Sequence, residues 1–206
     1  MTTPPRISAV ARNGTHAPIG GLGRIGGFAL LLLAGCGGGG HHHGAPIQTF
    51  ACSGVAALLP DQVSLECPGS ASGMIPVRVV LGGQSTSSDI YGFKFDLVFD
   101  PAVLAFVPPA VEGPFLNQGG APTILEAGTQ PGAPGRLIVA ITRQGAVGGV
   151  QASFPMVLVM TLSFGATGTG STTLAFENGE AVDPSMPPAA IPSIQFVAQP
   201  LTISFQ

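Results

Sequence analysis

The chain of 206 residues contains 8% charged and 45% apolar residues, with 31 glycines and 20 prolines. This apolar content excludes an intrinsically disordered polar chain. The glycine and proline content disfavours long helices and suits short strands joined by tight turns. The formal net charge is −3, and Lys94 is the single lysine. Because a nucleic-acid surface needs clustered basic residues, we expect no nucleic-acid partner.

Residues 1–35 are expected to be a targeting segment rather than part of a fold. An apolar run at 25–35 is too short to span a bilayer as a helix but fits the core of a secretory signal. The run ends Leu33-Ala34-Gly35-Cys36, which resembles the signal of bacterial lipoproteins. The resemblance implies export and a diacylglyceryl group on Cys36, which would anchor the chain in a membrane. Because Gly37 follows, the outer membrane is favoured.

Residues 36–57 are expected to form a flexible tether, because four consecutive glycines favour a flexible coil. The triplet His41-His42-His43 could bind a transition metal weakly, or it could be a polar spacer. No further histidine follows it to complete a site, so we expect no metal and no other cofactor. Cys52 and Cys67 are free to pair in an oxidising compartment, and the bridge would stabilise the fold by about 3 kcal/mol.

A strand with one buried face is predicted from 90 to 99. Small or polar residues such as Gly92, Lys94 and Asp96 occupy alternate positions, which is the pattern of a half-buried strand. Asp100-Pro101 ends the strand, because proline cannot donate to a ladder of hydrogen bonds. The positions expected to face inward are all large and apolar: Tyr91, Phe93, Phe95, Leu97 and Phe99.

Eight further segments have the composition and alternation of strands, and turn residues separate them. In the segment 156–164 the inward face is expected to hold Met156, Leu158, Met160, Leu162 and Phe164. With no helical pattern between them, about nine strands predict an all-β fold. It is an antiparallel two-sheet β-sandwich of the jelly-roll or Greek-key kind over 58–206. The eight segments are 63–66, 74–81, 103–107, 123–127, 136–143, 156–164, 172–177 and 194–205, the last interrupted at Pro200.

Several short motifs on these strands point to one family. Tyr91 to Pro101 has the form Tyr-Gly-Phe-x-Phe-x-Leu-x-Phe-Asp-Pro and precedes Val103-Leu104. Gly113-Pro114-Phe115-Leu116, Gly135 to Leu137 and Gly170 to Leu174 follow in order. Together they resemble the cohesin domain of cellulosome scaffoldins over roughly residues 60–206. Related sandwiches, including some carbohydrate-binding modules, share the Phe-Asp-Pro-x-x-Leu element.

Cohesins bind dockerin modules through one sheet face and so attach enzymes to a scaffold or cell surface. The resemblance therefore implies a non-catalytic module that holds a dockerin-type protein at the bacterial envelope, in the context of polysaccharide degradation. The partner face would include Lys94 and Asp96, which point outward, and could include Thr173 and Ala175 on the neighbouring strand. An ordinary solvated sheet face accounts for Lys94 and Asp96 equally well.

Two other functions are considered. A glycoside hydrolase needs only two carboxylates, but none of the aspartate and glutamate side chains stands in a recognisable catalytic motif. The domain also has no histidine, so we expect that the protein is not an enzyme. Direct polysaccharide binding would use exposed aromatic rings. The chain has no tryptophan, and only Phe115 and Phe154 lie near turns where they could be exposed. The candidate carboxylates are Asp89, Glu112, Glu126, Glu177, Glu180 and Asp183.

Overall fold

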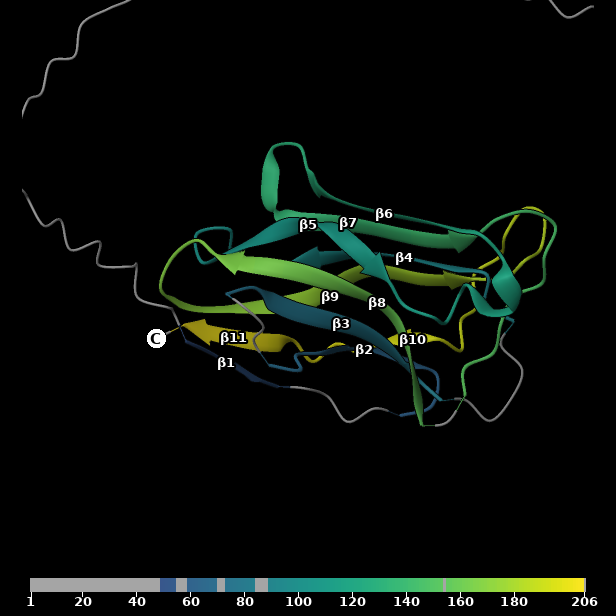
Figure 1. Ribbon diagram of the computed structural model, residues 1–206, viewed down its shortest axis with the longest axis horizontal. Coiled ribbons are helices and arrows are strands. Elements are labelled where there is room, and N and C mark those ends of the chain that lie inside the picture. Colours follow the sequence, from purple (N-terminus) through teal and green to yellow (C-terminus); the bar gives the residue numbers. More distant parts are fainter. Residues whose placement is uncertain (1–48, 55–58, 70–72, 84–88, 154, 206) are drawn as a thin grey trace, which may run out of the picture. The chain divides into compact units, whose positions relative to one another are not determined.

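The computed structural model describes residues 49–54, 59–69, 73–83, 89–153 and 155–205. They belong to the compact unit His43–Gln206, and the unit Met1–His42 lies outside them. Figure 1 shows strands throughout, and these confirm the predicted all-β fold. The elements are β1 (Phe50–Ser53), β2 (Gln62–Glu66), β3 (Ile75–Gly82), β4 (Gly92–Val98), β5 (Leu104–Glu112), the 3-10 helix η1 (Gln118–Gly120), β6 (Thr123–Gln130), β7 (Ala133–Arg143), β8 (Met156–Ala166), β9 (Gly170–Val182), β10 (Gln195–Phe196) and β11 (Leu201–Phe205).

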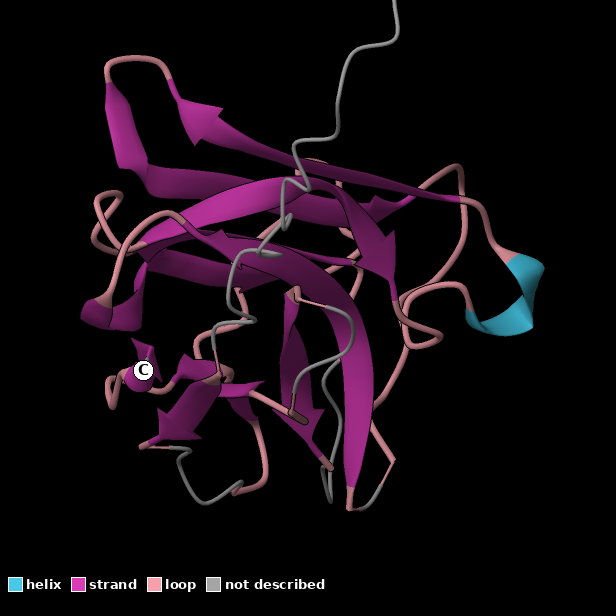
Figure 2. Ribbon diagram, turned by 60° about the vertical axis from the view of Figure 1, so that its left-hand side comes forward, coloured by secondary structure: helices cyan, strands magenta, loops and turns pink. Residues whose placement is uncertain are grey.

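The strands form two sheets that lie as two layers (Figures 1 and 2). One sheet has the order β1-β11-β9-β4-β7-β6, and the other has the order β10-β2-β3-β8-β5. The pairings are antiparallel, as predicted, with the exception of β10, which runs parallel to β2. The predicted break at Pro200 is also present, and it separates β10 in one sheet from β11 in the other.

The predicted central strand, β4, lies between β9 and β7 in the six-stranded sheet. Phe93, Phe95 and Leu97 are buried, as the alternation predicts. The Phe95 ring lies against the rings of Phe176 and Phe196, with centroids 5.2 and 5.8 Å away. Phe176 comes from the same sheet and Phe196 from the opposite one, so this aromatic group joins the two layers. Aromatic pairs at this separation add to the stability given by burial alone.

Tyr91 was expected to lie in the core, and it does so only in part. The residue is half-buried, and its hydroxyl donates a hydrogen bond to the carbonyl of Gly145, 2.9 Å away. It precedes the first residue of β4, at one end of the sandwich. A phenol with its polar tip satisfied at the end of a layer needs less burial than a phenylalanine ring.

The strand predicted at 103–107 is too short, because β5 continues through Pro108 and Pro109 as far as Glu112. The register between β5 and β8 shifts between Val107 and Val111, so the prolines stand outside the ladder. β5 is an edge strand. A proline is tolerated there because the missing N–H would face solvent rather than a neighbouring strand.

The structure also contradicts the prediction that one face of 156–164 points inward along its whole length, because the first half of the segment does not follow it. Val79 pairs with Met160 and Val80 with Leu158, which leaves Val159 as an extra residue in β8. Such a β-bulge reverses the alternation on one side of it. Val159 is therefore buried, while Leu158 is half-buried and Met156 is exposed.

The folded domain begins earlier than residue 58. Phe50–Ser53, expected to lie in the tether, form β1 and pair with β11. Phe50 and Cys52 are half-buried against the core, whereas Ala51 and Ser53 are exposed. The alternation covers only four residues, which is too short a signal to identify a strand from sequence.

The expected bridge between Cys52 and Cys67 is present in the structure, with an S–S distance of 2.00 Å. Cys52 lies on β1 in the six-stranded sheet, and Cys67 directly follows β2 in the five-stranded sheet. The bridge therefore joins the two layers and fixes the short edge strand β1 to the domain.

Removing this bridge should lower the free energy of unfolding by about 3 kcal/mol, because the cross-link restricts the unfolded chain. The measurement is urea denaturation of the unit His43–Gln206 carrying Cys52→Ala and Cys67→Ala. A reducing agent should destabilise the unsubstituted chain and leave the doubly substituted one unchanged. Without reducing agent, equal free energies of unfolding for the unsubstituted and the doubly substituted chain would show that the bridge contributes nothing.

Candidate functional site

The candidate site is the outward face of the six-stranded sheet, on the side of β4 opposite the buried phenylalanines. Residues directly opposite each other on paired strands point to the same face. Asp96 stands opposite Ile138 of β7 and Glu177 of β9, and Lys94 stands opposite Glu180. These side chains therefore share one surface.

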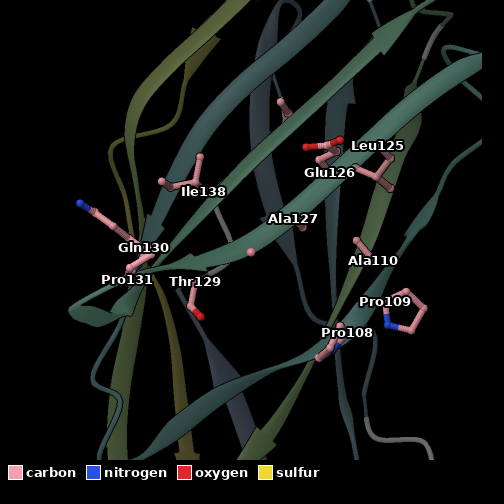
Figure 3. Close-up of a pocket in the computed structure, with 12 residues that line it drawn as sticks. Pro108, Pro109, Ala110, Leu125, Glu126, Ala127, Thr129, Gln130, Pro131 and Ile138 are labelled. Atoms are coloured by element: carbon pink, nitrogen blue, oxygen red, sulfur yellow. The ribbon is translucent and has the colours of Figure 1, made fainter.

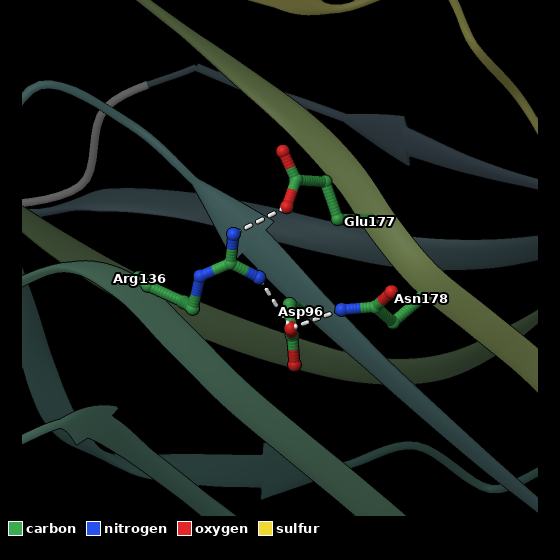
Figure 4. Close-up of polar contacts among 4 residues, drawn as sticks. All are labelled: Asp96, Arg136, Glu177 and Asn178. Atoms are coloured by element: carbon green, nitrogen blue, oxygen red, sulfur yellow. Dashed lines mark hydrogen bonds and ion pairs between the residues drawn. The ribbon is translucent and has the colours of Figure 1, made fainter. Parts of the chain in front are cut away.

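Asp96 is the centre of a polar network (Figure 4). The Nη1 atom of Arg136 lies 2.6 Å from Oδ2 of Asp96, and the other terminal nitrogen of Arg136 binds the carboxylate of Glu177. Asn178 donates from Nδ2 to the same Asp96 oxygen at 2.8 Å. Arg136, which has two carboxylate partners, has a raised pKa, caused first by the hydrogen bond to Glu177 and then by that to Asp96.

A β-bulge in β9 allows this network to form. The register between β4 and β9 shifts between Lys94 and Asp96, and Asn178 has a φ of 51°. Asparagine tolerates this left-handed backbone region better than most residues. Glu177 and Asn178 can therefore both reach the Asp96–Arg136 pair, although side chains of adjacent strand residues normally point to opposite faces.

A second ion pair and two exposed isoleucines flank the network. Nζ of Lys94 lies 2.9 Å from Oε2 of Glu180. On the other side of β4, the Ile138 side chain is 47% exposed, and Ile124 of the next strand is nearly as exposed. The face thus combines a charged centre with exposed apolar neighbours.

A hollow of about 370 Å³ lies between the end of β4 and the start of β9. Thr173, Ala175 and Glu177 line it from β9, and Val98 lines it from β4. Thr173 is exposed and Ala175 is half-buried. All four residues predicted for the partner face, Lys94, Asp96, Thr173 and Ala175, therefore lie on the outward face of one sheet.

Sequence reasoning missed Arg136, Ile138 and Asn178 as members of this face. The inward alternation predicted for 136–143 already implied that Arg136 and Ile138 point outward. It did not reveal that β7 lies beside β4, which follows from the sheet order alone. The position of Asn178 depends on the bulge, for which the sequence gives no clear signal.

The carboxylates considered for catalysis do not gather into one group. Glu177 and Glu180 bind the cations of the face, and Glu112 accepts a hydrogen bond from the hydroxyl of Thr123 at 2.5 Å. Asp89 and Glu126 are exposed.

Asp183 has a structural role. Its Oδ1 accepts hydrogen bonds from the hydroxyl and N–H of Ser185 and from the N–H of Ala189. These bonds lower its pKa, the Ser185 hydroxyl most of all. The described part of the chain holds no group of three or more His, Cys, Asp or Glu side chains suited to a metal ion.

Phe115, for which the sequence left exposure open because it lies near a turn, is only 1% exposed. Its ring packs beside Phe93 with centroids 6.3 Å apart, because the turn after β5 folds back over the core. Phe154, Cys36 and His41-His42-His43 lie outside the described residues. Within the described ranges, no helix has the length and apolar character needed to cross a membrane.

No protein-family model and no curated protein matches this sequence. Among solved structures, the second type II cohesin module of the adaptor ScaA scaffoldin of Acetivibrio cellulolyticus is similar, with a TM-score of 0.52 and 14% identity over 75% of this chain and 88% of that one. The type II cohesin dyad of the same scaffoldin has a TM-score of 0.50 and 15% identity over 70% of this chain and 47% of that one.

A type II cohesin from a cohesin–X–dockerin complex of Acetivibrio cellulolyticus gives a TM-score of 0.49 and 14% identity, over 66% of this chain and 92% of that one. The likeness to the ScaA module shows that the described domain has a cohesin-like β-sandwich fold.

The Asp96 network should contribute more to stability than the Lys94–Glu180 pair. The Asp96 side chain is 15% exposed and that of Lys94 is 60% exposed, and exposed ion pairs contribute little. Replacing Asp96→Asn should lower the melting temperature by about 2–4 °C, whereas Lys94→Met should leave it almost unchanged. Calorimetry at low and high salt measures both. A larger loss for Lys94→Met would contradict the ranking.

Proposed function

We propose that this chain is a non-catalytic binding module that holds a dockerin-type protein on the outward face of its six-stranded sheet. The observation that carries the proposal is the polar network around Asp96, set on a sandwich whose fold resembles type II cohesin modules. The strand motif from Tyr91 to Pro101 supports the same interpretation, because it matches the cohesin pattern.

The geometry of the face suits a protein rather than a small molecule. Arg136 is held by two carboxylates, so its position is fixed before a partner arrives. Ile138 beside it offers an exposed apolar contact, and the hollow at Ala175 can receive a side chain. Preordered charges and apolar anchors lower the conformational entropy lost on binding.

The charge of the face also indicates the kind of partner. Two cations, Lys94 and Arg136, share it with four carboxylates, those of Asp96, Glu126, Glu177 and Glu180. The excess of negative charge attracts a partner surface rich in lysine or arginine and repels an acidic one. We therefore expect basic residues on the dockerin-type partner where it meets β9.

The position of the module in the cell completes the proposal. The lipoprotein-type motif that ends at Cys36 supports export and a lipid anchor in the envelope, with the outer membrane favoured by Gly37. A module anchored there would keep partner enzymes, such as those that degrade polysaccharides, close to the cell. Direct polysaccharide binding gains no support from Phe115, whose ring is buried.

The partner face can be tested with two matched substitutions. Glu180→Gln removes a carboxylate from the proposed face, and Glu66→Gln removes one from β2 in the opposite sheet. Binding of a dockerin-bearing protein, measured by calorimetry with the unit His43–Gln206, should weaken about tenfold for Glu180→Gln, because a basic partner loses an attractive charge. It should be unchanged for Glu66→Gln.

Three other outcomes would favour a different face or a different function. An equal effect of the two substitutions would contradict the choice of face. Retention of the domain on insoluble polysaccharide, with no dockerin-bearing protein bound, would favour direct sugar binding. Hydrolysis of a glycan that is lost in Glu112→Gln or Glu177→Gln would favour an enzyme.

The anchor has its own test. When the full chain is expressed in a Gram-negative host, labelled palmitate should be incorporated and the chain should sediment with membranes. Cys36→Ser should abolish incorporation and release the chain into the soluble fraction. Cys52→Ser, which cannot affect lipidation at residue 36, serves as the control. Membrane association that survives Cys36→Ser would contradict the proposed anchor.

A further inference from the structure

The two sheets have four edges, and three of them are poor templates for another strand. β1 has four residues, β10 has two, and β5 is interrupted by Pro108-Pro109. β6 is different, because it has eight residues and no proline. Natural sandwiches usually shorten or interrupt exposed edges to prevent pairing between molecules. Because the other three edges are short or interrupted, the long and regular edge of β6 indicates that this strand pairs with a strand of another molecule.

The hydrogen bonds of β7 show which groups of β6 are free. Arg143 donates its N–H to the carbonyl of Tyr91, on the β4 side. The next residue, Gln144, donates to the carbonyl of Pro122, on the β6 side. Backbone groups of successive strand residues point to opposite sides. Even-numbered residues of β7 therefore bond to β6.

The even-numbered residues of β6 are their partners, since Glu126 stands opposite Ala140 and Gly128 opposite Ile138. The odd-numbered residues of β6 consequently direct their N–H and C=O groups toward the free edge. No backbone hydrogen bond joins them to another element in the described part of the chain. These residues are Thr123, Leu125, Ala127 and Thr129.

A groove of about 570 Å³ follows this edge (Figure 3). Pro108, Pro109 and Ala110 of β5 line one side of it, and residues 125–131 line the other. The lining is mainly apolar, and the two prolines have no N–H with which to bond a new strand. The groove can therefore seat the side chains of an added strand while its backbone bonds to β6.

We propose that this added strand is β6 of a second copy of the chain, paired antiparallel about a twofold axis at Ala127. Ala127 then faces its own copy, and Leu125 faces Thr129 of the second copy. Each of these pairs can exchange two hydrogen bonds through the free edge groups. The pairing uses the free edge of β6, whereas the partner face is the outward side of the sheet, and Glu126 belongs to both.

The side chains of β6 fit this register. On the outward side, Glu126 faces Gly128 of the second copy, and nothing lies within 4 Å of the place where a side chain on Gly128 would start. The carboxylate therefore meets open space rather than a like charge. Moving the axis to Glu126 would set two carboxylates directly against each other, which destabilises a cross-strand pair.

The test uses a pair of substitutions that differ only in charge. Gly128→Lys places a cation opposite Glu126 of the second copy, and Gly128→Glu places an anion there. Sedimentation equilibrium of the unit His43–Gln206 should show a reversible dimer. The dissociation constant should rise about tenfold for Gly128→Glu and fall several-fold for Gly128→Lys, because each dimer contains two such contacts.

Amide hydrogen exchange provides a second readout that does not depend on substitution. The N–H groups of Leu125, Ala127 and Thr129 should exchange more slowly as the concentration of the chain rises, while exposed amides elsewhere should not change. A chain that stays monomeric at every concentration would overturn the proposal and leave the edge to an extended strand of another protein. A dimer equally affected by the two Gly128 substitutions would also overturn it.

Discussion

The structure depends on the burial of one side of β4 between two layers. Phe95 contacts Phe176 of the neighbouring strand and Phe196 of the opposite sheet, and these two rings also contact each other at 5.2 Å. Phe196 packs directly over Gly179, where a side chain would begin 2.3 Å from the ring. The glycine next to the bulge is therefore required for the same packing that closes the core.

This packing also determines the outward face. With its phenylalanines held inside, β4 must present Lys94 and Asp96 to solvent. The bulge at Asn178 then brings a second group to Asp96 while Gly179 makes room for Phe196. The core and the candidate binding surface are thus built by the two sides of the same pair of strands. A loss of packing at Phe95 would disturb the surface as well as the stability.

The sequence was sufficient for the fold class and for the face on which Lys94 and Asp96 lie, because strict alternation leaves a strand no other choice of sides. It was not sufficient where one residue changes that alternation, as at Val159 and Asn178. It also could not reveal which strands are neighbours. Only the observed sheet order placed Arg136 in the candidate site, because its contact with Asp96 joins residues forty positions apart in the sequence.

If the outward side of β4 and its neighbours receives a protein partner while the inward side forms the core, titration with a dockerin-bearing protein should perturb one face only. Amide chemical-shift mapping of the domain should show shifts concentrated at Lys94, Asp96 and Ile138, with Arg78 on β3 of the opposite sheet unaffected. Shifts confined to the five-stranded sheet, or no shifts at saturating partner, would contradict this arrangement.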